Sequence, residues 1–323
     1  MADTSVTAHS RLEHFPIAFF AVVMGLGGFT LAARASEHAL GASNWVSGAS
    51  LIATIAAFAL ISLIYIAKAA RYPDAVAAEW AHPVRIAFFP AVSVSILLIA
   101  TAIAPLMPDL ARGIWLVGAA LQAILTLAVV ANWIGHRLFE QAHLTPAWFI
   151  PAVGNVIVPV AGPPLGYVEL SWLFFSAGMM FWLVLLTLVV NRLIFHSPLP
   201  GRLLPTLVIL IAPPAVAFIA WLRLTGEVDA FARILLNAGY VWAGVVLTQA
   251  PKFRRLPFAL SWWALSFPVA ALSVASLLFA SETGSTAHEA IGLALVALLT
   301  VILVGLGART VAALRAQEIC RPE

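Results

Sequence analysis

The chain has 323 residues, of which 63% are hydrophobic and only 10% are charged, and its mean hydropathy is +1.02. A soluble domain carries about 25% charged residues, so this composition excludes a water-soluble globular protein. The net charge of +3 comes from basic residues that flank apolar runs, which is typical of membrane anchors and not of a nucleic-acid-binding surface. The one cysteine, Cys320, excludes a disulfide within the chain, and no metal-ligand cluster or cofactor motif is found.

Ten apolar runs predict ten transmembrane helices. They span 15–33, 45–68, 85–105, 111–135, 147–161, 167–194, 203–222, 229–248, 257–280 and 287–313. The runs are continuous and do not alternate between polar and apolar residues, so helices are favoured over a β-barrel. We therefore expect an all-α membrane protein with one transmembrane domain over 1–323, a short tail at 1–13 and another at 314–323.

The basic residues predict the orientation in the membrane. If the ten runs cross in alternate directions, 13 of the 17 Lys and Arg residues fall on the side of the N-terminus. Cytoplasmic loops carry an excess of Lys and Arg. This asymmetry predicts that both termini are cytoplasmic.

Proline divides the ten runs into two alternating classes. The even-numbered runs contain none, whereas the odd-numbered runs contain Pro16, Pro90, Pro151, Pro159, Pro213, Pro214 and Pro268. Proline normally breaks or kinks a helix, and a membrane tolerates the freed backbone groups only where neighbouring helices or water satisfy them. We therefore expect bent odd-numbered helices in an inner ring around a central pore, with the even-numbered helices outside them.

The polar residues of the odd-numbered runs indicate what such a pore would carry. Asn155, Ser93 and Ser266 are candidate pore-lining residues, together with the bends at Pro90, Pro151, Pro213 and Pro268. No Asp or Glu lies well inside a run, and intramembrane carboxylates usually mark cation sites and proton relays. This pattern favours anions.

Two arginines at predicted cytoplasmic ends, Arg85 and Arg309, are candidates for attracting anions to the pore. Either one could equally be a residue that extends to the lipid headgroups. In the motif EWAHPVR, we expect Glu79 to pair with Arg85 across the loop. Gly25 and Gly27, within an apolar run, are interpreted as helix-packing residues and not as a nucleotide motif.

Several stretches carry a resemblance to a known family. They are HFPIAFFAVVMGLGG at 14–28, EWAHPVR at 79–85, PAWFIPAVGN at 146–155, LFFSAGMMFW at 173–182, IAPPAVA at 211–217, TGEVD at 225–229 and WWALSFP at 262–268. In this order, on ten apolar runs, they resemble the tellurite-resistance/dicarboxylate transporter family, which includes bacterial TehA and the plant guard-cell slow anion channels.

The resemblance implies ten helices arranged as five hairpins around a pore, with the odd-numbered helices inside. It implies a homotrimer in the bacterial inner membrane, each protomer with its own pore. A phenylalanine of the ninth helix plugs the pore in this family, and it matches Phe267 of LSFP. The implied function is a gated channel or channel-like transporter for small anions such as chloride, nitrate and related oxyanions, with an associated tellurite-resistance phenotype.

The sequence leaves two other functions to consider. The family also contains secondary transporters of C4-dicarboxylates such as malate and of sulfite, with or without proton coupling, and the lack of carboxylates within the spans disfavours coupling. A membrane-embedded enzyme is disfavoured because the sequence contains no HExxH, GxSxG or P-loop motif. We therefore expect an anion-transporting protein that is not an enzyme and uses no cofactor.

Overall fold

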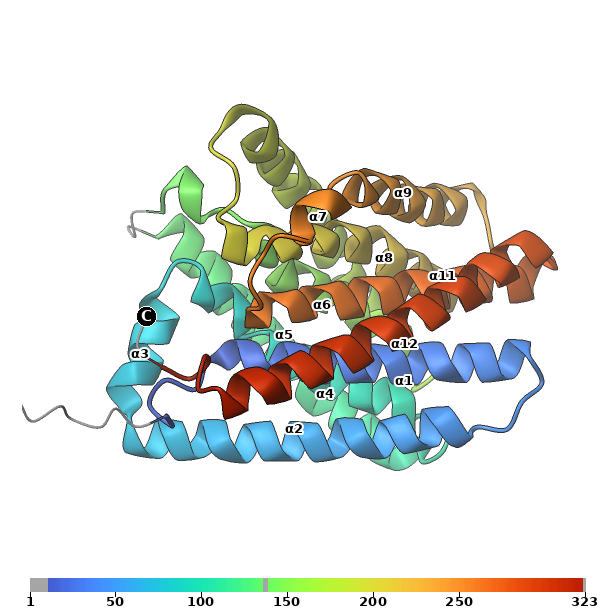
Figure 1. The fold of residues 1–323 in the computed structure, drawn as a ribbon. Coiled ribbons are helices and arrows are strands. Elements are labelled where there is room, and N and C mark those ends of the chain that lie inside the picture. The colour runs from blue at the N-terminus through green and yellow to red at the C-terminus, as the bar shows by residue number, and fades with distance from the viewer. Residues whose placement is uncertain (1–10, 136–138, 322–323) are drawn as a thin grey trace, which may run out of the picture.

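The computed structural model describes residues 11–135 and 139–321, and these residues form helices joined by short turns (Figure 1). The predicted all-α membrane fold is confirmed. The α-helices are α1 (Phe20–Ala39), α2 (Trp45–Arg71), α3 (Pro73–Ala81), α4 (Ala91–Ile103), α5 (Pro108–Ile134), α6 (Phe149–Ala161), α7 (Val168–Phe195), α8 (Ala212–Thr225), α9 (Ala230–Leu247), α10 (Ala250–Phe253), α11 (Ser266–Thr283) and α12 (Thr286–Arg315). The 3-10 helices are η1 (Ile17–Phe19), η2 (Arg85–Phe88), η3 (Gln141–His143), η4 (Pro146–Trp148), η5 (Gly201–Ile211) and η6 (Leu260–Leu265).

Within these described ranges, nine helical segments are long and apolar enough to cross a membrane. They match nine of the ten predicted runs to within a few residues at most ends. The remaining run, 147–161, corresponds to η4 and α6, which together cover only Pro146–Ala161. This segment is shorter because Pro163 and Pro164 follow it in a turn.

Burial separates the segments into two classes. In α1 and in the segments that contain α4, α8 and α11, between 61% and 89% of the most apolar stretch is buried inside the protein. The corresponding share is between 17% and 33% in α2, α5, α7, α9 and α12. Nearly every described residue of α6 is buried as well. We call α1, α4, α6, α8 and α11 the inner helices and the second set the outer helices. The proline-containing runs are therefore the buried ones.

The prolines do not act as the expected mid-helix kinks. Each inner helix is preceded by a 3-10 segment. Pro16 precedes the 3-10 segment η1 as its N-cap, and the other prolines named above, apart from Pro159, lie where a 3-10 segment gives way to an α-helix. Pro90 is the N-cap residue of α4, and Pro151, Pro213 and Pro268 lie in the first turns of α6, α8 and α11. The first N–H groups of an α-helix have no partner within the helix, so proline costs little there. Pro159 is the exception, because it lies inside α6.

Glycine lets α1 pack closely on α11. A Cβ atom on Gly25 would overlap the Ser266 side chain, and one on Gly28 would lie 2.9 Å from Ala270 Cβ. A Cβ atom on Gly27 would lie 3.1 Å from Leu98 Cβ of α4. The helix-packing interpretation of these glycines agrees with this arrangement, which holds three inner helices together.

The described chain begins and ends at the same end of the helix bundle, which we call the N/C end (Figure 1), and Arg11 Nη2 donates to the Leu314 carbonyl oxygen there at 3.0 Å. There α3, a short helix that the sequence analysis did not predict, positions Glu79. The expected Glu79–Arg85 pair is wrong, because the Glu79 carboxylate binds Lys68 Nζ at 2.7 Å. Glu79 also accepts hydrogen bonds from Tyr65 Oη and from the backbone N–H of Ile17, so it joins α2 and α3 to the start of the first inner segment.

Candidate functional site

Two cavities lie among the inner helices. The first has a volume of about 40 Å³ and is lined by Ala21, Met24, Phe88, Val94, Ile150, Gly154, Ile157, Ile209, Ala212, Leu260, Ser261, Trp263, Ala264, Phe267 and Pro268. The second also has a volume of about 40 Å³ and is lined by Gly28, Leu31, Leu98, Thr101, Ile157, Val160, Val216, Ile219, Phe267, Ala270, Ala271 and Val274. All five inner helices, or the 3-10 segments before them, contribute to both cavities.

The lining residues recur at helical spacing. On α6 they are Ile150, Gly154, Ile157 and Val160, which lie three or four residues apart and therefore on one face of the helix. The residues nearer the N/C end line the first cavity, and residues further along each inner helix line the second. The two cavities therefore follow one another along the bundle.

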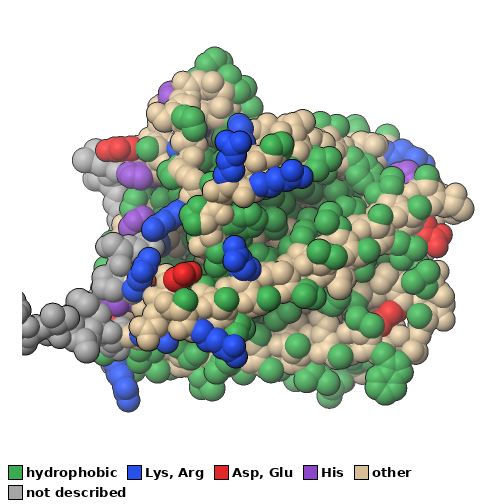
Figure 2. All heavy atoms as spheres, viewed as in Figure 1, with side chains coloured by type: hydrophobic (Ala, Val, Ile, Leu, Met, Phe, Trp, Pro, Cys, Tyr) green, Lys and Arg blue, Asp and Glu red, His purple; other side chains and the backbone are tan. Residues whose placement is uncertain are grey.

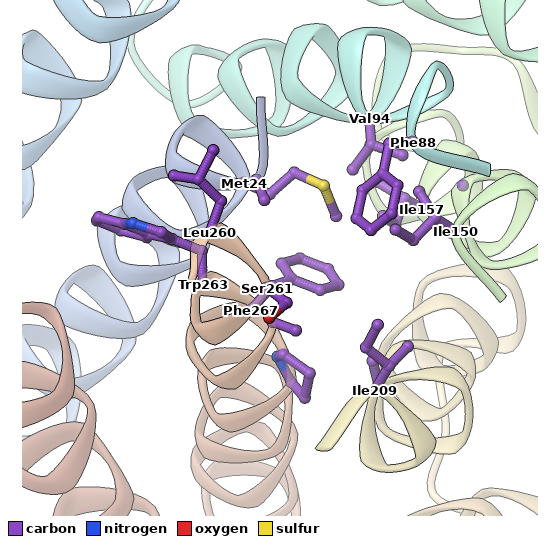
Figure 3. A pocket seen from close by; sticks show the side chains of 15 residues that line it. Met24, Phe88, Val94, Ile150, Ile157, Ile209, Leu260, Ser261, Trp263 and Phe267 are labelled. Carbon is purple, nitrogen blue, oxygen red and sulfur yellow. The ribbon is translucent and has the colours of Figure 1, made fainter. Parts of the chain in front are cut away.

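Phe267 and Ile157 line both cavities. Figure 3 shows the Phe267 side chain extending from the start of α11 toward the side chains of the other inner helices. The side chain is only 8% exposed. Its ring packs against Gly28, where an added Cβ atom would lie 3.3 Å from Phe267 Cδ2. The ring thus occupies the region where the two cavities adjoin.

The described residues of the cavity walls include no charged side chain. No Asp, Glu, Lys, Arg or His is among the lining residues, and the hydroxyls are those of Ser261 and Thr101. The Thr101 hydroxyl donates to the Leu97 carbonyl oxygen at 2.7 Å. A lining of this kind offers an ion neither a fixed opposite charge nor a fixed like charge.

Asn155 does not line either cavity. Its side chain is 2% exposed, and Nδ2 donates to Thr126 Oγ1 at 3.1 Å and to the Pro151 carbonyl oxygen at 3.0 Å. The structure therefore places this amide between α6 and the outer helix α5. The expectation of a pore-lining donor is corrected, because a buried amide near a hydroxyl and a carbonyl is satisfied by them.

Ser93 belongs to the same network. Its hydroxyl contacts the Pro90 carbonyl oxygen at 2.8 Å and Gln122 Oε1 at 2.7 Å. Gln122 Nε2 in turn donates to the Pro151 carbonyl oxygen at 2.9 Å. The network ties α4, α5 and α6 together behind the cavity wall and not on it.

Of the other predicted pore-lining residues, only Pro268 lines a cavity. Ser266 is fully buried and donates to the Trp263 carbonyl oxygen at 2.6 Å. Pro90, Pro151 and Pro213 are not among the lining residues of either cavity, although their neighbours Ile150 and Ala212 are. The prolines therefore shape the start of each inner helix, while the residues beside them form the wall.

The two predicted anion-attracting arginines both lie toward the N/C end. Arg85 begins η2 and is half-buried, whereas Arg309 is exposed on the outer helix α12. Neither lines a cavity. Arg85 precedes Phe88, a residue of the first cavity, by three residues, whereas Arg309 lies on a helix that lines neither cavity. The roles of both arginines stay predictions.

The roles of Gln122 and Thr126 were not predicted, because the even-numbered runs were interpreted as uniformly apolar. Both side chains are buried and bind the Pro151 carbonyl oxygen. The available signal was a glutamine in the middle of an apolar run, since a polar side chain in a membrane helix normally faces a protein neighbour.

Comparisons with known proteins agree with this architecture. The model of the family described as "SLAC1: Voltage-dependent anion channel" matches residues 14–311. The S-type anion channel SLAH3 of Arabidopsis thaliana is 28% identical over 309 residues, which cover 93% of this chain and 48% of that protein. The guard cell S-type anion channel SLAC1 of the same plant is 26% identical, over 88% of this chain and 53% of that protein. The chain thus spans about half the length of these plant relatives.

A bacterial relative matches along most of its length. The tellurite resistance protein TehA homolog of Haemophilus influenzae is 30% identical over 267 residues, which cover 82% of this chain and 81% of that protein. The family match covers more than half of this chain, and it agrees with the apolar helices and with the resemblance stated from the motifs. The chain is therefore a member of the SLAC1 voltage-dependent anion channel family.

Proposed function

We propose that the chain conducts small anions, such as chloride, nitrate and related oxyanions, through a pathway formed by the two cavities, and that Phe267 is its gate. One observation carries this proposal: Phe267 lines both cavities, so its ring occupies the region where they adjoin. Membership of an anion channel family supports the choice of ion class.

The proposed gate works by excluding water. A bulky apolar ring at a narrow point raises the cost of bringing an ion and its hydration shell through, and a hydrophobic constriction of this kind can close a pore by dewetting. Movement of the ring away from Ile157 would join the two cavities. Because no carboxylate lines the walls, an anion meets no electrostatic repulsion there.

The proposal includes the orientation of the protein in the membrane and its oligomeric state. The described chain begins and ends at one end of the bundle, and the positive-inside rule favours the cytoplasmic side for that end. The bacterial inner membrane is part of the proposal through the family resemblance. A homotrimer and a tellurite-resistance phenotype follow from the family resemblance and remain part of the proposal. Large exposed apolar side chains such as Leu127 and Val301 on the outer helices suit contact with lipid or with another protomer.

The test is electrical recording of the purified protein in planar bilayers. Under a chloride gradient, the current should reverse at the Nernst potential of chloride. A current that reverses at the potential of the cation, or no current from the wild type and the Phe267→Ala variant alike, would overturn the proposal.

The alternative is a C4-dicarboxylate or sulfite transporter coupled to protons. Within residues 11–135 and 139–321, no titratable side chain lines either cavity, so this part of the wall offers no group that could carry a proton with the substrate. A pH gradient across the bilayer should therefore leave the reversal potential unchanged. A shift of that potential with the pH gradient would favour the coupled transporter.

A further inference from the structure

The end of the bundle opposite the termini, which we call the far end, carries more acidic than basic residues. Its carboxylates are Glu37, Asp109, Glu169, Glu227, Asp229, Glu282 and Glu289, and its arginines are Arg34, Arg112, Arg223 and Arg233. On the face shown in Figure 2, most Lys and Arg side chains gather toward the N/C end, whereas Asp and Glu side chains lie at both ends. An anion approaching from this side meets a surface that is acidic overall.

Two of the four far-end arginines are engaged away from the cavities. Arg112 Nη1 lies 3.3 Å from Asp109 Oδ1, and both residues are on the outer helix α5. The Arg233 guanidinium lies over the Phe279 ring, 5.2 Å from its centroid. Within the residues that the structure describes, Arg34 and Arg223 make no ion pair with a carboxylate.

Arg34 and Arg223 are also the two far-end arginines that lie on inner helices. On α8, Val216 and Ile219 line the second cavity, and Arg223 follows them by seven and four residues, which places it on the same helix face. Arg223 is exposed. It therefore lies one turn beyond the cavity wall, on the side of the far end.

Arg34 has a similar position on α1. It follows Leu31, a residue of the second cavity, by one turn. Its Nη1 donates to the Ala102 carbonyl oxygen at 2.6 Å, and Ala102 directly follows Thr101, another residue of that cavity. This hydrogen bond holds the guanidinium at the far-end border of the second cavity.

Two of the carboxylates near these arginines accept hydrogen bonds from other groups. Glu37 Oε1 accepts from the backbone N–H groups of Val46 and Ser47 at 2.7 and 3.2 Å, so it caps α2. Asp229 accepts from Trp221 Nε1 and caps α9. These hydrogen bonds hold the two carboxylates in place but leave their negative charge, and Glu37 lies one turn from Arg34 on α1. The two arginines therefore offset the acidic surface next to the second cavity but do not act there alone.

We infer that Arg34 and Arg223 form an anion-capture site at the far-end mouth of the pathway, which draws small monovalent anions past the acidic surface into the second cavity. The inference rests on the proposed function. A purely structural role would use the same positions, since an arginine near a helix C-terminus stabilises the helix dipole and its last carbonyls. The two roles differ in their dependence on salt and on the direction of flow.

The experiment records single-channel conductance of the wild type, Arg34→Gln, Arg223→Gln and the double variant in symmetric 10 mM and 500 mM potassium chloride. At 10 mM, the double variant should lose about two- to fivefold of its conductance, because a charged mouth raises the local anion concentration. At 500 mM, where the screening length is a few Å, the loss should be under about 1.5-fold. The loss should be larger at the voltage polarity that drives anions in from the far end.

Two comparisons separate charge from structure. Arg112→Gln removes a charge from the same end on an outer helix and should leave the conductance at 10 mM unchanged. Arg34→Lys and Arg223→Lys keep the positive charge without the guanidinium geometry, so these variants should retain most of the conductance at 10 mM. Equal conductance of the double variant and the wild type at 10 mM, or an equal loss at both salt concentrations, would overturn the inference.

The outcomes also separate this inference from the proposed function. The absence of anion current from the wild type and from the Phe267→Ala variant alike overturns the proposed function. A wild-type anion current that the double variant reproduces at low salt overturns the capture site alone. Arg223 is exposed, so Arg223→Gln should elute as the wild type does in size-exclusion chromatography, and it carries the test if Arg34→Gln does not fold.

Discussion

Lys68 Nζ and Glu79 Oε2 lie 2.7 Å apart at the N/C end, and their side chains are only 2% and 4% exposed. Lys68 also donates to the Phe15 carbonyl oxygen at 2.9 Å. Glu79 accepts from the Ile17 backbone N–H at 3.1 Å. The ion pair thus fastens α2 and α3 to the residues that start the first inner segment, and each charge has hydrogen-bonding partners in addition to the other.

Lys68→Met should destabilise the protein strongly. It leaves the Glu79 carboxylate buried without its counter-charge, which costs about 3–5 kcal/mol for a buried pair. The double variant Lys68→Met with Glu79→Leu should recover most of that loss, because no charge is then left unpaired. Thermal unfolding in detergent, followed by tryptophan fluorescence, measures both. If the single and double variants unfold at the same temperature, the unpaired Glu79 carboxylate is not the cause of the lost stability.

Phe267→Ala should increase the anion conductance. Removing the ring joins the two cavities and lowers the barrier for a hydrated anion, and about 1.4 kcal/mol of barrier corresponds to a tenfold change in rate. We therefore expect an increase of about tenfold or more, with Phe267→Leu intermediate. The measurement is single-channel conductance in planar bilayers.

The control for this variant is Phe175→Ala. Phe175 is buried to a similar extent on the outer helix α7 and packs against Trp221, but it lines neither cavity. It should lose stability without a gain in conductance. A comparable gain from Phe175→Ala would show that loosened packing, and not an opened gate, raises the current.

Gly154→Ala should destabilise the junction of α5 and α6. An added Cβ atom would overlap the Gln122 side-chain amide, and overpacking of a buried site costs about 1–3 kcal/mol. Combining it with Gln122→Ala removes the overlap, so the double variant should be more stable than the sum of the two single effects predicts. Thermal unfolding of the four proteins gives this coupling.

The matched control lies on α5 itself. A Cβ atom on Gly113 would meet no atom within 4 Å. Gly113→Ala should therefore be neutral, or stabilising by about 0.5–1 kcal/mol through the better helix propensity of alanine. Additive effects of Gly154→Ala and Gln122→Ala would contradict the predicted overlap.

Selectivity among anions should follow the cost of removing their water. Among the described residues, the cavity walls supply two hydroxyls, those of Ser261 and Thr101, and no charged donor to replace a hydration shell. We expect thiocyanate and nitrate to pass more readily than chloride, and chloride more readily than fluoride. Reversal potentials under paired-anion conditions give the order, and a preference for fluoride over nitrate would require a strong donor on the wall.

Much of the fold could be predicted from the sequence. The apolar runs predicted the membrane helices, because each must span the hydrocarbon with its backbone satisfied internally. The proline pattern predicted which runs are buried. It did not predict that Pro151, Pro213 and Pro268 lie in first turns behind 3-10 segments, because propensity alone does not fix where a helix begins.

The direction of single side chains was harder to predict. Asn155 was expected on the pore wall, yet Thr126 and the Pro151 carbonyl bind it on the opposite side. In a helix surrounded by protein, every face is apolar, so hydrophobic periodicity cannot identify the face that lines a cavity. Gln122 indicated which face of α6 meets α5, since a polar residue in an outer helix needs a partner on an inner helix.

The sequence by itself determined that this chain is a bundle of membrane helices, that its proline-containing runs differ from the others, and, through its motifs, which family it resembles. Only the tertiary structure decided which side chains line the cavities, that Phe267 lies where they adjoin, and that Arg34 and Arg223 are the arginines next to the far-end cavity. The physical reason is that composition and spacing fix what a helix buries in lipid or protein. The rotation of each helix about its axis is set by contacts between residues far apart in the chain, such as Gly28 with Ala270 and Gln122 with Pro151.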